Sequence, residues 1–159
     1  MKVEDLQKAS EQTNDCIIAA RELYSELVTL LRYLEKARGW SIGNLFGGSF
    51  FKVDRNEALS QVNTSAKYIK RLNRRYQMAL GELSVSIKSD SSIAASKVVL
   101  DMIVGNTVTE WIVHNDIVKA IKQNRWCLSE LDDQIVELEK QEVVFEERVS
   151  IILRENKDK

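Results

Sequence analysis

A histidine flanked by two carboxylates is the arrangement in this sequence that most suggests chemistry. His114 follows Glu110 by four residues and precedes Asp116 by two, so a helical stretch could bring an imidazole and a carboxylate together. A metal site, however, requires at least three ligands. The sequence has neither a second histidine nor an HExxH motif. We interpret His114 as a structural histidine and predict no catalytic residue, no metal site and no enzyme activity.

The spacing of Gly43 and Gly48 matches the two glycines of a phosphate-binding P-loop. In a P-loop, lysine and then serine or threonine follow the second glycine, and they meet phosphate and magnesium. Ser49 and Phe50 stand at those positions here, and no buried strand precedes the glycines. We therefore predict no nucleotide or other cofactor, and no small-molecule substrate is evident.

The two cysteines, Cys16 and Cys127, fall on or beside apolar helical positions, and neither has a second cysteine nearby. We interpret them as buried thiols in a reducing compartment. The first residues are charged where a signal peptide would be apolar, and no uncharged run approaches the ~18 residues of a membrane span. A cytoplasmic location is the expectation.

Long helices must position any functional side chain, because the 159 residues include no proline and only six glycines. Apolar residues recur in two interleaved heptad series, which predict helices over 3–38, 55–88 and 115–156. The segment 91–114 is apolar without a clear period, and we expect it to be short helices or irregular. The sequence thus predicts an all-α fold. It would be a single domain over 1–159, an elongated antiparallel bundle of three long helices plus a shorter segment, coiled-coil-like in its packing.

The ends of the first two helices carry local signals. Gly39 follows the last periodic residue of the first helix, where a glycine often ends a helix. Asp54, with Glu57 three residues later, is a capping-box arrangement for the second helix. Four heptad positions are polar, which is typical of residues that fix register or oligomeric state. They are Thr13, Asn73, Asn124 and Glu142.

The segment between these helices, 39–53, combines glycines with large apolar side chains. Burying each such side chain contributes roughly 1.5 to 3 kcal/mol of favourable free energy. We therefore expect them to be buried against some other surface. They could fold back over the bundle end, contact a partner protein or dip into a membrane surface. As candidate partner-binding residues we name Trp40, Leu45, Phe46, Phe50 and Phe51.

A basic stripe with three- and four-residue spacing lies on the second predicted helix, beside Tyr68. It could follow a phosphate backbone or anionic headgroups. The last helix offers an internal alternative, since acidic residues outnumber basic ones ten to five over 127–159, whereas basic residues lead seven to four over 54–90. The candidate anion-binding residues are Lys67, Lys70, Arg71, Arg74 and Arg75.

The run from Ala37 to Gly48, with Glu57-Ala58-Leu59 opening the next helix, resembles a pattern in uncharacterised bacterial coiled-coil proteins. In that family a long helix ends in a Trp-Gly segment and a Gly-Gly loop before a second long helix. The similarity covers roughly residues 27 to 87. It implies a bacterial, cytoplasmic protein in which Trp40 and the loop glycines matter as a unit, and it implies no established activity.

These observations predict a helical scaffold or protein-protein interaction module. Its partner would be another protein or a second copy of the chain, as in a homodimer. The alternative is binding to nucleic acid or an anionic membrane through the basic stripe and the apolar loop.

Overall fold

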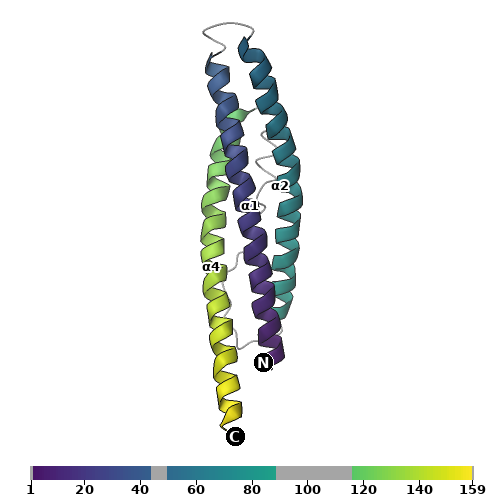
Figure 1. Cartoon of the computed structure of the whole chain (residues 1–159), viewed down its shortest axis with the longest axis vertical. Helices are drawn as coiled ribbons and strands as arrows, with labels where there is room; N and C mark the ends of the chain where they lie inside the picture. Colours follow the sequence, from purple (N-terminus) through teal and green to yellow (C-terminus); the bar gives the residue numbers. More distant parts are fainter. Residues whose placement is uncertain (1, 44–49, 89–115, 159) are drawn as a thin grey trace. The chain divides into compact units, whose positions relative to one another are not determined.

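The structure is a computed structural model that describes residues 2–43, 50–88 and 116–158, with side chains over 2–39, 57–87 and 116–158. Within these ranges the chain forms α1 (Val3–Gly43), α2 (Phe50–Lys88) and α4 (Ile117–Lys157), which Figure 1 labels in chain order. The described residues contain no strand, and the helices pack against each other. The prediction of an all-α bundle is confirmed.

The residues separate into two compact units, and each helix contributes a part to both. The described part of unit 1 is 2–21, 74–88 and 132–158, and that of unit 2 is 22–43, 50–73 and 116–131. No helix therefore belongs to one unit alone. The single domain over 1–159 stays a prediction.

In unit 1, side-chain contacts define the helix directions. Arg21 of α1 pairs with Glu139 of α4, while Leu6 and Ala9, earlier in α1, form a buried cluster with Phe145, later in α4. These two helices are therefore antiparallel. Tyr76 of α2 bonds to Gln134, and Ile87, further along α2, packs against the Phe145 cluster, so α2 and α4 are parallel.

Unit 2 joins the same three helices through other residues. The Ser65 hydroxyl of α2 donates to Glu26 of α1 over 2.7 Å, and Arg125 of α4 pairs with Glu35 of α1 over 2.6 Å. Its core is mostly leucine and isoleucine with almost no exposed surface, which is the hydrophobic burial that stabilises such a helix layer. The largest of these side chains are Leu23, Leu27, Leu30, Leu34, Ile69, Ile121 and Leu131.

The predicted heptad series agree closely with burial on α1, where all ten positions are buried. They are Leu6, Ala9, Thr13, Cys16, Ala20, Leu23, Leu27, Leu30, Leu34 and Ala37. On α2 and α4 most positions of the series are buried. The half-buried ones are Leu59, Ile87, Ile117, Leu128, Glu142, Val149 and Ile152. The apolar period therefore identified the packed face of each helix.

Two predicted helix boundaries are wrong. α1 continues through Gly39 to Gly43, and α2 begins at Phe50, so Asp54 lies inside α2 and does not cap it. A single glycine inside a helix costs only about 1 kcal/mol relative to alanine, which does not stop a long helix. No glycine or proline occurs between Gly48 and Asp54 to delay the next one. Of the predicted segment 39–53, residues 39–43 therefore belong to α1 and residues 50–53 to α2. The remaining residues 44–49, and the predicted segment 91–114, lie outside the described residues.

Candidate interaction surfaces

Asp116, one of the carboxylates near His114, caps a helix. Its Oδ1 accepts a hydrogen bond from the backbone N–H of Lys119 over 3.2 Å, and its carbonyl accepts one from Ala120. A carboxylate at this position satisfies a free N–H group and complements the positive end of the helix dipole. Glu110 and His114 lie outside the described residues, so the structure assigns Asp116 a structural task of its own.

Both cysteines are buried and neither forms a disulfide. Cys16 occupies a heptad position and Cys127 lies beside one, as predicted. Burial raises the pKa of Cys16 to about 12, with smaller contributions from the carboxylates of Asp15 and Glu82. The nucleophilic form of cysteine is the thiolate, so a thiol held protonated this firmly is a packing group. Burial likewise raises the pKa of the Tyr76 phenol above its ordinary value, and its hydroxyl donates to Gln134 over 2.5 Å.

Three of the four polar heptad residues are buried, and they differ in how their polar atoms are paired. The Thr13 hydroxyl donates to the Ala9 carbonyl over 2.7 Å. Asn73 Oδ1 and both side-chain polar atoms of Asn124 are buried without a hydrogen-bond partner in the described part of the chain. Glu142 is only half-buried. Asn73 and Asn124 both belong to unit 2.

The predicted partner-binding residues divide between helix ends and the segment outside the description. Trp40 falls in the last turn of α1, and Phe50 and Phe51 open α2. Leu45 and Phe46 lie in 44–49, outside the described residues, and none of the five side chains is described. Their partner-binding role stays a prediction.

All five residues of the basic stripe are exposed on α2. Arg71 lies over the ring of Tyr68, with its guanidinium carbon 5.8 Å from the ring centroid. Such a cation-π contact orients a guanidinium without neutralising it. Lys67, Lys70 and Arg71 belong to unit 2, whereas Arg74 and Arg75 belong to unit 1. Two ion pairs join α4 to α1. Glu139 of α4 pairs with Arg21 of α1, and Arg125 of α4 pairs with Glu35 of α1.

An apolar stripe on the outer side of α4 in unit 1 was not predicted. Val136, Val143, Val144 and Ile151 are each more than 40% exposed, although Leu138 and Phe145 on the same helix are fully buried. Spacings of seven and eight residues place the four on one face, opposite the core. The signal was present in the sequence as a second apolar period on this helix, offset from the heptads that form the core.

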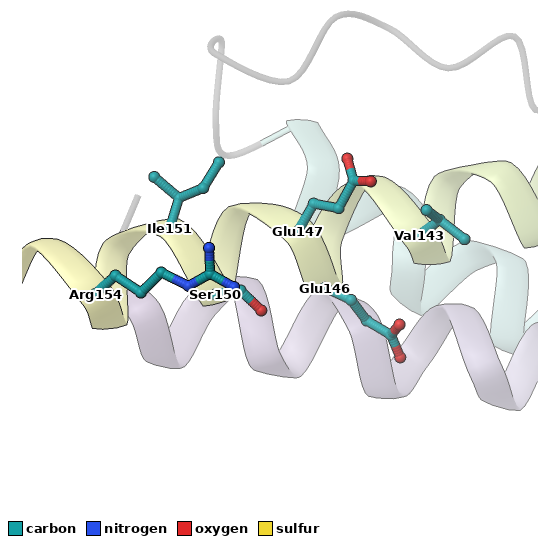
Figure 2. Close-up of a pocket in the computed structure, with 6 residues that line it drawn as sticks. All are labelled: Val143, Glu146, Glu147, Ser150, Ile151 and Arg154. Atoms are coloured by element: carbon teal, nitrogen blue, oxygen red, sulfur yellow. The ribbon is translucent and has the colours of Figure 1, made fainter.

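The same face carries a shallow pocket lined by residues of α4 from Val143 to Arg154. Figure 2 shows Glu147 and Ile151 projecting on one side of the helix, whereas Glu146 projects toward the other side. Successive turns of this one helix form all of the described lining, so in the described part of the chain the pocket follows the helix surface. Such a surface suits another helix better than an enclosed small molecule.

No protein-family model, curated protein or solved structure matches this chain. Among the described residues, no three His, Cys, Asp or Glu side chains are grouped to hold a metal ion. Of the three described helices, none has an apolar stretch long enough to cross a membrane. The function must therefore be argued from the surfaces themselves.

Proposed function

We propose that this chain is a helical interaction protein, a scaffold whose surface binds another protein or a second copy of itself. The observation that carries the proposal is the exposed apolar stripe of Val136, Val143, Val144 and Ile151 in unit 1. Scattered apolar side chains are ordinary on a protein surface, but a row of four along one helix face resembles the contact surface of paired helices.

Other exposed apolar side chains are consistent with a binding role for the helices. Met78 and Val85 on α2 of unit 1 are about 70% exposed and one heptad apart. In unit 2, Trp126 of α4 is half-exposed, and tryptophan is among the residue types enriched at binding hot spots. The apolar residues between α1 and α2, from Trp40 to Phe51, are the second candidate contact of the proposal.

Three variants separate the candidate surfaces. The first replaces Val136, Val143, Val144 and Ile151 with serine, and the second replaces Trp40, Leu45, Phe46, Phe50 and Phe51 with serine. The third, a matched control at two isolated exposed apolar positions, replaces Ile18 of α1 and Val118 of α4 with serine. Light scattering, chemical cross-linking and capture from the native cell are compared with the wild-type chain.

We expect the first or the second variant to lose a cross-linked product or change the measured mass, while circular dichroism shows unchanged helicity. The control variant should behave like the wild type. If both variants keep every cross-linked product and the same mass, the proposed function is wrong.

The basic stripe supports a second function, binding of nucleic acid or an anionic membrane. Lys67, Lys70, Arg71, Arg74 and Arg75 are all exposed, so each is accessible to a phosphate group. Every phosphate contact adds affinity that falls with salt concentration, because binding releases counterions.

The test of this function replaces Arg71, Arg74 and Arg75 with glutamate. The control makes the same charge change at three exposed lysines outside the stripe, Lys8, Lys122 and Lys157. Binding to DNA, RNA or acidic vesicles should weaken at least tenfold in the first variant and much less in the control. Absence of any binding by the wild-type chain at low salt would exclude the function.

A further inference from the structure

The outer face of α4 in unit 1 is self-complementary in its order of side chains. The centre of this order is the peptide bond between Val143 and Val144. Lys140 lies before it and Glu147 after it, at equal distances along the sequence. The next residues are Val136 and Ile151, which are both exposed and apolar. Asp133 and Arg154 follow at equal distances from the centre, again with opposite charges. The outward pattern is apolar, charged, apolar, charged in both directions.

These eight residues share one face by helix geometry. Steps of three, four, seven and eight residues return to the same side of an α-helix. The charged members, Asp133, Lys140, Glu147 and Arg154, are all exposed. Leu138 and Phe145 are buried on the other side of α4, toward the other helices of unit 1, so the face is directed away from the core of the unit.

We propose that a second copy of this chain docks on this face, with the two α4 helices antiparallel and a two-fold axis between Val143 and Val144. The inference rests on the proposed interaction function and names its partner. In an antiparallel pair, residues at equal distances on opposite sides of the axis face each other. Lys140 then meets the partner's Glu147, and Asp133 meets the partner's Arg154. Val136 packs against the partner's Ile151, and Val143 packs against the partner's Val144 at the centre.

The order of charges selects a second copy and selects its direction. A two-fold interface requires a patch that complements itself, which an unrelated partner does not require. In a parallel pair with the same register, Lys140 would face the partner's Lys140 and Glu147 the partner's Glu147. Like charges placed opposite each other disfavour that pairing, so the charges act against the parallel dimer as well as for the antiparallel one.

Lys140 also lies 3.5 Å from Glu137, three residues earlier on its own helix. This contact is solvent-exposed, and exposed pairs of this kind contribute little, so the lysine can reorient toward a partner. The apolar centre is short, with four large side chains from each copy. Stable dimers bury about 800 Å² per partner, so we expect a dimer whose population depends on concentration in the micromolar range.

The decisive experiment uses the full chain with single charge reversals, Lys140→Glu and Glu147→Lys, in sedimentation equilibrium. The wild type should show a reversible monomer-dimer equilibrium. Each variant alone repeats a like-charge contact twice across the axis, so its dissociation constant should rise at least tenfold. An equimolar mixture of the two variants pairs glutamate with lysine at both contacts, and it should recover dimer to within about threefold of wild type.

A control reversal, Lys8→Glu, changes an exposed lysine of α1 in the same unit and leaves the outer face of α4 unaltered. It should leave the dissociation constant unchanged. Unchanged circular dichroism and melting temperature in all three variants show that the monomer fold is intact. A wild type that is monomeric at all concentrations, or two variants that do not rescue each other, would overturn the antiparallel dimer.

Cysteine cross-linking tests the direction independently. Val136→Cys mixed with Ile151→Cys should form an intermolecular disulfide, because these positions face each other across the axis. Val136→Cys alone should not, since its two copies would stand about 22 Å apart at about 1.5 Å per residue. The buried Cys16 and Cys127 are present in both reactions and serve as background. Disulfide formation by Val136→Cys alone would indicate parallel helices and contradict the proposal.

The results of these experiments distinguish a failure of the proposed dimer from a failure of the proposed interaction function. A monomeric wild-type chain that still loses a heterologous partner when Val136, Val143, Val144 and Ile151 are replaced overturns the dimer and retains the interaction function. A monomer that keeps every partner in that variant and in the variant of the residues from Trp40 to Phe51 overturns both.

Discussion

Units 1 and 2 use the same three helices and the same apolar period, yet they differ in the polar groups they bury. In unit 1 the hydroxyls of Thr13 and Tyr76 donate to an Ala9 carbonyl and to Gln134. In unit 2, Asn73 and Asn124 bury polar atoms that lack a partner among the described residues. Unit 1 has one such atom, Gln12 Oε1, on a half-buried residue. A heptad pattern thus determines which residues are buried, whereas the chemistry of single polar residues determines how well each layer is stabilised.

The largest expected effect comes from truncating each core in turn. Phe145→Ala in unit 1 and Leu30→Ala in unit 2 remove fully buried side chains, and each should lower the free energy of unfolding by about 3 to 5 kcal/mol. Hydrogen exchange measured by mass spectrometry would locate the loss of protection. We expect it to be greatest over 132–158 in the first variant and over 22–39 in the second.

Leu153→Ala is the matched control at an exposed apolar position of α4, and it should change the free energy of unfolding by less than about 0.5 kcal/mol. Equal loss of protection in both units for both core variants would show that the two units unfold together. Units 1 and 2 would then differ in the polar groups that they bury but not in their local stability.

A smaller effect, of opposite sign, is expected at the unpartnered asparagine of unit 2. Asn124→Leu replaces two buried polar atoms without partners by apolar atoms of similar volume. The free energy of unfolding should rise by about 1 to 2 kcal/mol, because the desolvation penalty of those atoms is removed. Urea denaturation measures the change, and Asn63→Leu on the exposed surface of α2 is the control. Destabilisation by Asn124→Leu would mean that the amide has a polar partner in solution and would erase this difference between the units.

The part of the fold that could be predicted from sequence is the part governed by periodic burial. On α1 every heptad position is buried, because thirty-odd residues of consistent apolar spacing outweigh any local preference. Helix ends depend on single residues. Gly39 and Asp54 predicted the end of α1 and the start of α2 incorrectly, since both residues lie inside helices. Glycine and aspartate favour termini by only about 1 kcal/mol, less than the continuation of a long helix provides.

The candidate surfaces were predicted less completely, for a different reason. The basic stripe follows from spacing alone, and its five residues are exposed as a charged face should be. The apolar stripe of Val136, Val143, Val144 and Ile151 was missed because apolar residues on a helix are first assigned to its core. Only the buried positions of Leu138 and Phe145 show that α4 has two apolar faces, and only then does the symmetric order of charges on the outer face become visible.

Alkaline pH should weaken the chain through the buried thiol of unit 1. The pKa of Cys16 is about 12 in the folded chain, against 9.0 for an unperturbed thiol. The folded state therefore holds this proton more tightly, so the stabilisation is fully present below pH 9 and is lost as the pH rises toward 12. Between pH 8 and 10 the free energy of unfolding should fall by about 1 kcal/mol.

Cys16→Ala removes this titration, so the pH dependence over that range should become shallower while the stability at pH 7 is slightly lower. Urea denaturation at each pH measures both. The Tyr76 phenol, whose pKa burial also raises, contributes mainly near and above pH 10, where at least half of its unfolded form is ionised. An unchanged slope in the Cys16→Ala variant would show that the thiol does not account for the alkaline sensitivity of unit 1.

The smallest expected effects are those of the exposed ion pairs, one in each unit. Arg21 pairs with Glu139 over 2.5 Å in unit 1, and Arg125 pairs with Glu35 over 2.6 Å in unit 2. All four side chains are at least 44% exposed, so double-mutant cycles to alanine should give coupling free energies of about 0.2 to 1 kcal/mol in each unit. Both couplings should shrink between low salt and 1 M salt, because exposed charges are screened. Equal couplings would place the difference between the units in their buried polar groups, whereas a coupling several times larger in one unit would mean that surface charge also distinguishes them.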